Sequence, residues 1–202
     1  MLRYIPLCFC LLTGAAGVHV NAQDTPLRAP MDIPLYLSGN FGEFRSNHFH
    51  SGIDFKTQGV VGKPVYAVYD GYISRVLVSP WGFGKALYMT HPNGMTTVYG
   101  HIKGFTKEVE DYNRKQQYKR ESFSVDLQLP EELFPVKKGD LIAYSGNEGT
   151  SAGPHLHFEI RDTETEETMD PIPFYKSRLK DNRPPRLQGL MVYPVAQKGS
   201  IN

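Results

Sequence analysis

This 202-residue chain is organised around the stretch Gly153-Pro154-His155-Leu156-His157-Phe158-Glu159. Side chains of a β-strand alternate between two faces, so His155 and His157 share one face while Leu156 and Phe158 share the other. Two imidazoles on one face can have different roles in one site, because one ring can hold a metal while the other transfers a proton. This interpretation requires further ligands from elsewhere in the chain.

Short β-rich runs precede this stretch and are separated by turn signals. They cover residues 63–69, 72–78, 86–91, 95–101, 122–129 and 141–145. We expect Asp70-Gly71 to join the first two runs into a hairpin and Pro92-Asn93-Gly94 to join the next two. Because no long helices alternate with these runs, the pattern predicts a mostly β, antiparallel domain rather than an α/β fold.

The segment 103–121 interrupts the strand pattern. It is densely charged, and Phe105, Val109 and Tyr112 recur at helical spacing. This spacing predicts a short surface helix inserted between two strands.

The chain divides into four predicted parts. Residues 1–22 combine a basic Arg3, an apolar run and the small-residue site Val20-Asn21-Ala22, which is typical of a secretory signal peptide. A retained membrane anchor is the alternative, but glycines and His19 weaken the apolar run and no strong stop-transfer flank follows. We then expect an extended, loosely packed lead-in over 23–34, one domain over 35–176, and a linker with the start of a further segment over 177–202.

Composition limits the chemistry of the mature chain. Cys8 and Cys10 both lie in the predicted signal peptide, so cleavage leaves neither a disulfide nor a thiolate. Loss of Arg3 would reduce the 22 basic residues by one, so that basic and acidic residues would both number 21. This near-neutral balance gives no electrostatic footprint for a nucleic-acid partner.

The segment His50-Ser51-Gly52-Ile53-Asp54 supplies a histidine and a carboxylate four residues apart. Gly52 and β-branched Ile53 disfavour a helix, and in an extended segment residues 50, 52 and 54 share a face. A flat strand would separate the outer Cα atoms by about 13 Å, so the segment must curve to chelate one ion. We expect Gly52 to permit the curve and to leave room for the ion.

His50, Asp54 and one histidine of the His155/His157 pair then supply two imidazoles and one carboxylate. With water as the fourth ligand, this set is typical of a catalytic zinc site rather than a structural one. Zinc would polarise a scissile carbonyl and provide a nucleophile at neutral pH without a thiol or a serine.

The remaining histidines have other interpretations. His48 could replace His50 as a ligand, but it needs more curvature to reach Asp54, so we interpret it as exposed or as supporting the ligands. His91 lies at a hairpin turn, where we expect a structural role. His101 ends a strand that borders the site, which makes it a candidate proton donor or oxyanion stabiliser.

These motifs resemble the lysostaphin-type zinc metallopeptidases, also called LytM-like or M23 family peptidases, which cut peptide bonds in bacterial peptidoglycan. The resemblance covers roughly residues 35–171 and rests on separated motifs in the right order. They are His50-x-Gly52-x-Asp54, Gly62-Lys63-Pro64-Val65-Tyr66-Ala67 with Asp70-Gly71, Tyr99-Gly100-His101, Lys138-Gly139-Asp140 with Gly146 and Gly149, and Gly153 to Glu159.

The resemblance implies a role for each candidate site residue. It implies that His50, Asp54 and His157 hold the zinc and that His101 and His155 are the catalytic histidines. His155 is the implied general base, and His101 is implied to stabilise the tetrahedral intermediate. The implied fold is an antiparallel β-sheet groove of the duplicated-hybrid-motif kind, with loops as its walls.

We therefore expect a secreted zinc endopeptidase that hydrolyses peptide bonds in peptidoglycan stem peptides or cross-bridges. Its expected location is the periplasm or cell envelope, or outside the cell, with no membrane span after signal cleavage. A regulatory protein partner is a further expectation. The alternative is a non-catalytic wall-binding or hydrolase-activating module, because some relatives keep the fold but lose zinc ligands. In this chain all five positions are filled.

Two segments bear on access to the groove. The charged stretch 103–133 is longer than the connection of a minimal relative, and we expect it to reshape one groove wall. Occlusion of the groove by residues 23–34, or by sequence beyond Asn202, stays an open alternative.

Overall fold

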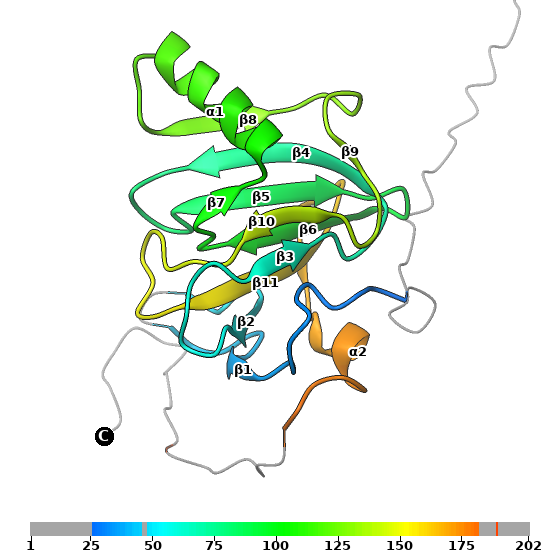
Figure 1. Cartoon of the computed structure of the whole chain (residues 1–202). Helices are drawn as coiled ribbons and strands as arrows, with labels where there is room; N and C mark the ends of the chain where they lie inside the picture. The colour runs from blue at the N-terminus through cyan, green and yellow to red at the C-terminus, as the bar shows by residue number, and fades with distance from the viewer. Residues whose placement is uncertain (1–25, 46–47, 182–188, 190–202) are drawn as a thin grey trace, which may run out of the picture.

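The computed structural model describes residues 26–45, 48–181 and 189. Its strands form two β-sheets (Figure 1). The larger sheet contains β1 (Leu37–Gly39), β2 (Ile53–Lys56), β4 (Gly71–Val78), β5 (Lys85–Thr90), β6 (Met95–Gly100), β8 (Val125–Gln128), β9 (Pro135–Val136), β11 (His155–Asp162) and β12 (Thr168–Met169). The smaller sheet contains β3 (Pro64–Tyr66), β7 (Gly104–Phe105) and β10 (Leu141–Tyr144). All of these strands pair antiparallel, so the predicted mostly β, antiparallel fold is confirmed.

The strand β11 lies inside the larger sheet. The strand order is β1-β2-β11-β6-β5-β4-β8, so β2 and β6 flank the histidine-bearing strand on its two sides. His157 pairs with Asp54 of β2 and with Gly100 of β6. Segments around residues 50 and 100, which are far apart in the sequence, therefore meet at β11.

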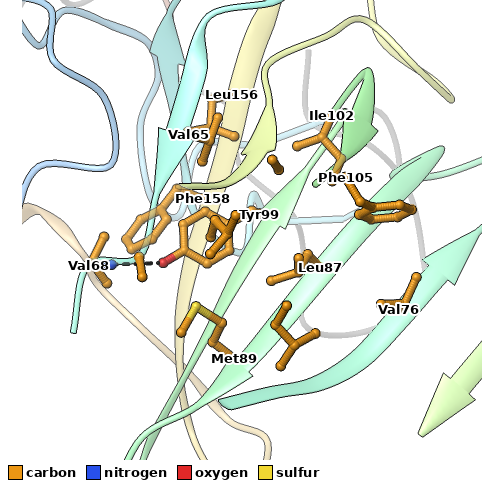
Figure 2. Close-up of a cluster of buried hydrophobic side chains, with 14 of the residues drawn as sticks. Val65, Val68, Val76, Leu87, Met89, Tyr99, Ile102, Phe105, Leu156 and Phe158 are labelled. Atoms are coloured by element: carbon orange, nitrogen blue, oxygen red, sulfur yellow. Dashed lines mark hydrogen bonds between the residues drawn. The ribbon is translucent and has the colours of Figure 1, made fainter. Parts of the chain in front are cut away.

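Side chains from both sheets build one apolar core (Figure 2). Leu156 and Phe158 of β11 lie in it with Tyr99 of β6 and Val65 of β3, and all four are 0% exposed. The Tyr99 hydroxyl accepts a hydrogen bond from the N–H of Val68 at 3.3 Å, which satisfies a buried polar atom. Because alternate residues of β11 fill this core, its two histidines are directed to the opposite face.

The prediction of a hairpin at Asp70-Gly71 was wrong. The strand β3 pairs with β10 in the smaller sheet, whereas β4 pairs with β5 in the larger one. Other segments hold Asp70: its carboxylate accepts a hydrogen bond from the N–H of Lys138 at 2.7 Å, and its carbonyl accepts one from the His91 ring at 2.8 Å. The chain thus crosses between sheets at this point instead of reversing within one. The hairpin predicted between β5 and β6 is confirmed.

The charged segment contains the predicted surface helix, α1 (Lys107–Lys119). Val109 and Asn113 form its buried face. The Tyr112 ring meets Phe134 edge-on, with ring centroids 5.6 Å apart. A second, shorter helix, α2 (Ile172–Tyr175), buries Tyr175 completely.

Residues 26–34 pack more closely than we expected. Leu27 and Met31 are only 2% and 1% exposed, and the carbonyl of Pro30 accepts a hydrogen bond from the N–H of Tyr66 at 2.8 Å. The expectation of loose packing was wrong for these residues because their apolar side chains complete the core.

The predicted signal peptide, residues 1–22, lies outside the described residues, as does most of the predicted C-terminal linker. The four-part division of the chain therefore stays a prediction. Within the described ranges, no helix combines the length and apolar character needed to cross a bilayer.

Gly52 lies where the chain approaches the backbone of β11. A Cβ atom at this position would lie 2.2 Å from the carbonyl oxygen of Phe158. The sequence-based prediction was that this glycine leaves room for an ion. The structure gives a different reason, because the close neighbour is a backbone carbonyl of the adjacent strand.

Replacing Gly52 with alanine should therefore destabilise the domain. The methyl group must push β2 and β11 apart, and overpacking of this kind costs about 1–3 kcal/mol. Denaturant unfolding would measure the loss. Gly153→Ala is the matched control, because a Cβ there meets nothing within 4 Å. Equal unfolding midpoints for the two variants would contradict the steric explanation.

Candidate metal centre

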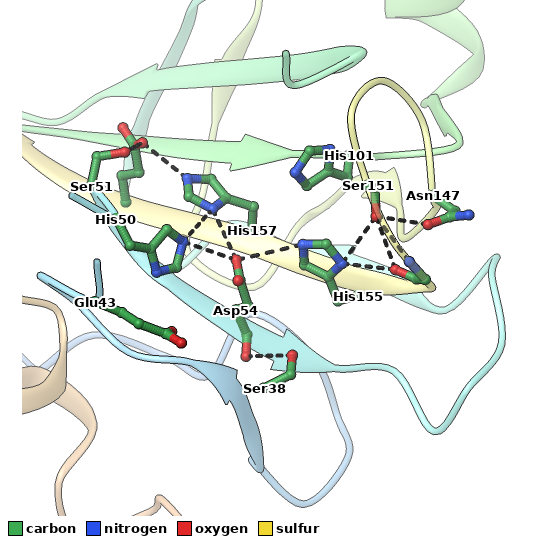
Figure 3. A network of polar contacts seen from close by, with 12 residues as sticks. Ser38, Glu43, His50, Ser51, Asp54, His101, Asn147, Ser151, His155 and His157 are labelled. Atoms are coloured by element: carbon green, nitrogen blue, oxygen red, sulfur yellow. Dashed lines mark hydrogen bonds and ion pairs between the residues drawn. The ribbon is translucent and has the colours of Figure 1, made fainter. Parts of the chain in front are cut away.

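Three buried side chains bring potential metal ligands together on the face of the larger sheet opposite the core (Figure 3). His50 Nε2 lies 3.1 Å from His157 Nδ1, and Asp54 Oδ1 lies 3.1 Å and 3.0 Å from these two atoms. Tetrahedral zinc with bonds of 2.0–2.1 Å places neighbouring ligands about 3.3 Å apart. The three atoms match that spacing to within a few tenths of an ångström.

The sheet register and a bend in the chain create this triangle. Asp54 and His157 are direct cross-strand partners on β2 and β11, so their side chains start close together. The strand β2 begins only at Ile53, and the chain bends at Gly52, which turns His50 back toward Asp54. The curvature expected for this segment is thus present.

The outward-facing nitrogens of both histidines have acceptors. His50 Nδ1–H donates to the carbonyl of Asn40 at 2.8 Å, and His157 Nε2–H donates to Glu159 Oε1 at 2.9 Å. With these tautomers, the inward nitrogens and the Asp54 oxygen all present lone pairs. Three acceptors about 3 Å apart repel one another unless a cation or a proton lies among them. The donor set therefore fits a divalent metal ion.

Asp54 is held in its charged form. Burial alone would raise the pKa of its carboxyl group, but hydrogen bonds and charge from His157 and His50 outweigh burial and hold the pKa well below the usual value. Its second oxygen, Oδ2, pairs with Arg45 Nη2 at 2.9 Å. Asp54 thus offers one oxygen to the metal site while Arg45 fixes the other.

His155 and His101 lie beside the triangle (Figure 3). His155 Nε2 is 3.5 Å from Asp54 Oδ1. The ring centroids of His155 and His101 are 4.7 Å apart. His155 Nδ1–H donates to the carbonyl of Gly153, and His101 Nδ1–H donates to that of Glu148, each at 2.8 Å. Each ring therefore keeps a lone pair on Nε2.

Burial, with smaller effects from neighbouring histidines, lowers the pKa of His101 to about 4. At neutral pH the ring is neutral, so it donates Nδ1–H to Glu148 and can accept a proton at Nε2. Its φ of 56° places a non-glycine residue in the left-handed region, a conformation that is concentrated at functional sites. Stabilisation of an oxyanion by His101 would require prior protonation of the ring.

Sequence reasoning gave no role to Glu159. This carboxylate is 0% exposed, accepts the hydrogen bond from His157 and forms an ion pair with Arg161 at 2.5 Å. It also accepts a hydrogen bond from the Ser51 hydroxyl. A carboxylate that orients a ligand histidine is a common support for metal sites. Its position two residues after His157, on the same strand face, was the signal that could have revealed it.

The five predicted site residues line one groove of about 1160 Å³. His48 lines it too and is exposed, as we expected. No described residue of the stretch 103–133 lines the groove, so the expectation that this stretch reshapes a wall was wrong. Residues 26–34 do not line it either, and the described part of the lead-in therefore does not occlude it.

His91 lies outside the groove and is buried, which agrees with the structural role expected for it. Its ring bridges the Asp70 carbonyl and the Thr97 hydroxyl, at 2.8 Å each. Burial lowers the pKa of His91 below the usual value for a histidine side chain. The unfolded chain therefore binds more protons than the folded protein once the pH falls below about 6.5.

This difference predicts that His91 destabilises the fold in acid. The free energy of unfolding should fall as the pH drops from about 6.5 through the lowered pKa of the folded state. Urea unfolding of the wild type and His91→Gln across this pH range would check it. The variant should show a shallower fall, and parallel curves would show that another group causes the acid sensitivity.

The fold and the site together define a β-groove domain with a candidate histidine–carboxylate metal centre. The chain matches the model of Peptidase family M23 over residues 48–118 and 131–171, which is more than half of its length. It belongs to this family, and the resemblance to lysostaphin-type peptidases is confirmed.

Individual relatives agree with this assignment. An uncharacterized metalloprotease of Haemophilus influenzae is 33% identical over 159 residues, which cover 73% of this chain and 28% of that protein. The DD-carboxypeptidase/endopeptidase Mpg of Neisseria meningitidis is 30% identical over 112 residues, 55% of this chain and 20% of Mpg. The chain thus spans less than a third of the length of these relatives. The structure of lysostaphin from Staphylococcus simulans has a TM-score of 0.53 at 25% identity, covering 72% of this chain and 50% of lysostaphin.

Proposed function

We propose that this protein is a zinc-dependent endopeptidase that hydrolyses peptide bonds in peptidoglycan stem peptides or cross-bridges. The observation that carries the proposal is the convergence of five side chains in one groove. His50, Asp54 and His157 would hold the zinc, and His155 and His101 keep proton-accepting nitrogens beside it. Zinc in such a site acts as a Lewis acid on a carbonyl and makes water nucleophilic at neutral pH.

The chain's own residues provide the proton chemistry. His155 would accept the proton of the attacking water through Nε2, because its Nδ1–H is committed to Gly153, and would return that proton to the leaving nitrogen as the C–N bond breaks. His101 presents its own Nε2 lone pair to the same region, and a proton taken up there from solvent water would let Nε2–H donate to negative charge on the tetrahedral intermediate. Arg45 and Glu159 hold Asp54 and His157 in position through the contacts described above.

The names of relatives support the reaction class. They include a DD-carboxypeptidase/endopeptidase, the antimicrobial peptidase lysostaphin and a glycyl-glycine endopeptidase. An apparent signal peptide supports a location in the periplasm or cell envelope, or outside the cell. A regulatory protein partner is part of the same proposal. The alternative of a non-catalytic module finds no specific support, because all five site positions are filled and assembled.

Digestion of purified sacculi tests this function. The zinc-loaded protein should release soluble muropeptides, a metal chelator should stop the release, and added zinc should restore it. His155→Ala should release none under the same conditions. Absence of release by the zinc-loaded wild type, or equal release by His155→Ala, would contradict the proposal.

A further inference from the structure

The charges that line the groove are unbalanced. Asp54 is the only carboxylate among the lining residues that the structure describes, whereas Arg45 and Lys56 both contribute positive charge. The Asp54 carboxylate is buried and contacts His50, His157 and Arg45, so it is committed to the metal site. The groove is therefore positive even before a divalent ion is counted, and it favours an anionic ligand.

The two cations differ in their partners. Arg45 forms ion pairs with Asp54 at 2.9 Å and with Glu43 at 3.4 Å. Lys56 is exposed, and no carboxylate of the described residues forms an ion pair with it. Its ammonium group thus remains available to a ligand in the groove.

Lys56 lies beside the candidate catalytic residue His155 in the larger sheet. It follows Asp54 by two residues on β2, so the two side chains lie on the same face of the strand. It is also the direct cross-strand partner of His155, and such partners have Cβ atoms about 4.5–5.5 Å apart. A peptide placed for attack beside His155 therefore passes within reach of the Lys56 ammonium group.

We propose that Lys56 determines substrate specificity by binding a free carboxylate of the peptide next to the scissile bond. The ligand class is thus a peptide with an ionised carboxyl group near the bond that is cut, rather than a neutral or amidated one. This inference rests on the proposed function and adds the substrate feature that the groove recognises.

Binding measurements with paired ligands test the inference. The ligands are cross-linked muropeptides and the same muropeptides with their carboxylates converted to amides by a carbodiimide and ammonia. The protein is zinc-loaded His155→Ala, which binds without turnover, and calorimetry measures the dissociation constants. We expect the carboxylate form to bind about tenfold more tightly than the amide, as for a hydrogen-bonded charged group.

Lys56 variants in the same background assign the preference to one side chain. Lys56→Gln should remove the preference, and Lys56→Glu should reverse it. Lys176→Gln is the control, because Lys176 is exposed but does not line the groove. Unchanged melting temperatures would show that the variants fold. A preference that survives in Lys56→Gln, or the lack of any preference in the parent, would overturn the inference.

A turnover assay separates this inference from the proposed function. Cleavage of both ligand forms by the wild type without a Lys56-dependent preference would overturn the inference alone. A Lys56-dependent binding preference without any cleavage by the wild type would contradict the peptidase function while leaving carboxylate recognition in place.

Discussion

In the His157→Ala variant, metal binding and peptide hydrolysis are expected to be lost together. Removing this ring leaves His50 and Asp54 as the remaining proposed ligands, too few for a catalytic zinc site of the usual kind. Turnover should fall by about 10³-fold or more, because both the polarised carbonyl and the nucleophile depend on the ion. Zinc content after dialysis and the initial rate on muropeptides would measure the two losses.

The variant also leaves Glu159 without its histidine partner, so instability has to be separated from ligand loss. Glu159→Gln is the matched control, because it keeps all three proposed ligands and the neutral amide oxygen can still accept the His157 hydrogen bond. Zinc affinity in Glu159→Gln should weaken by about 10–100-fold without being abolished. Melting both variants without metal would show whether either has lost the fold. Stoichiometric zinc in a folded His157→Ala would exclude His157 as a ligand.

Local alternation along a strand was enough to place the two histidines of β11 together. It placed His155 and His157 on one face and Leu156 and Phe158 on the other, because the period of side chains depends only on the local backbone. It could not distinguish the two histidines, since both share that face. The distinction comes from the pairing of β11 with β2, which puts His157 opposite Asp54.

Nonlocal pairing also explains the errors. The run 63–69 carries strand residues and ends at a turn signal, yet β3 pairs with β10 because the two bring Val65 and Ile142 into the core together. Likewise, nothing in the lead-in marks Leu27 and Met31 as core residues until the sheets that cover them are assembled. A turn dipeptide predicts a change of direction, but the partner of each strand depends on the whole fold.

Replacing His155 with alanine should have the opposite pattern to His157→Ala, with zinc retained and turnover lost. Its Nε2 atom lies 3.5 Å from Asp54 Oδ1, beside the triangle of ligand atoms rather than within it. Loss of a general base typically costs about 10²–10⁴-fold in rate. Zinc content and kcat/KM on the same muropeptides would be measured together. His91→Gln serves as a control histidine, because His91 is buried outside the groove.

The two catalytic candidates can then be tested against each other. The His155 and His101 rings lie 4.7 Å apart and each presents a lone pair on Nε2, so they can act on the same proton. If they share one transfer step, the double variant should be little slower than His155→Ala alone, because residues that act as a unit are not additive. If the rate loss of the double variant instead equals the product of the two single losses, His101 acts in a separate step. Zinc loss in His155→Ala equal to that in His157→Ala would make His155 a ligand and leave His101 as the base.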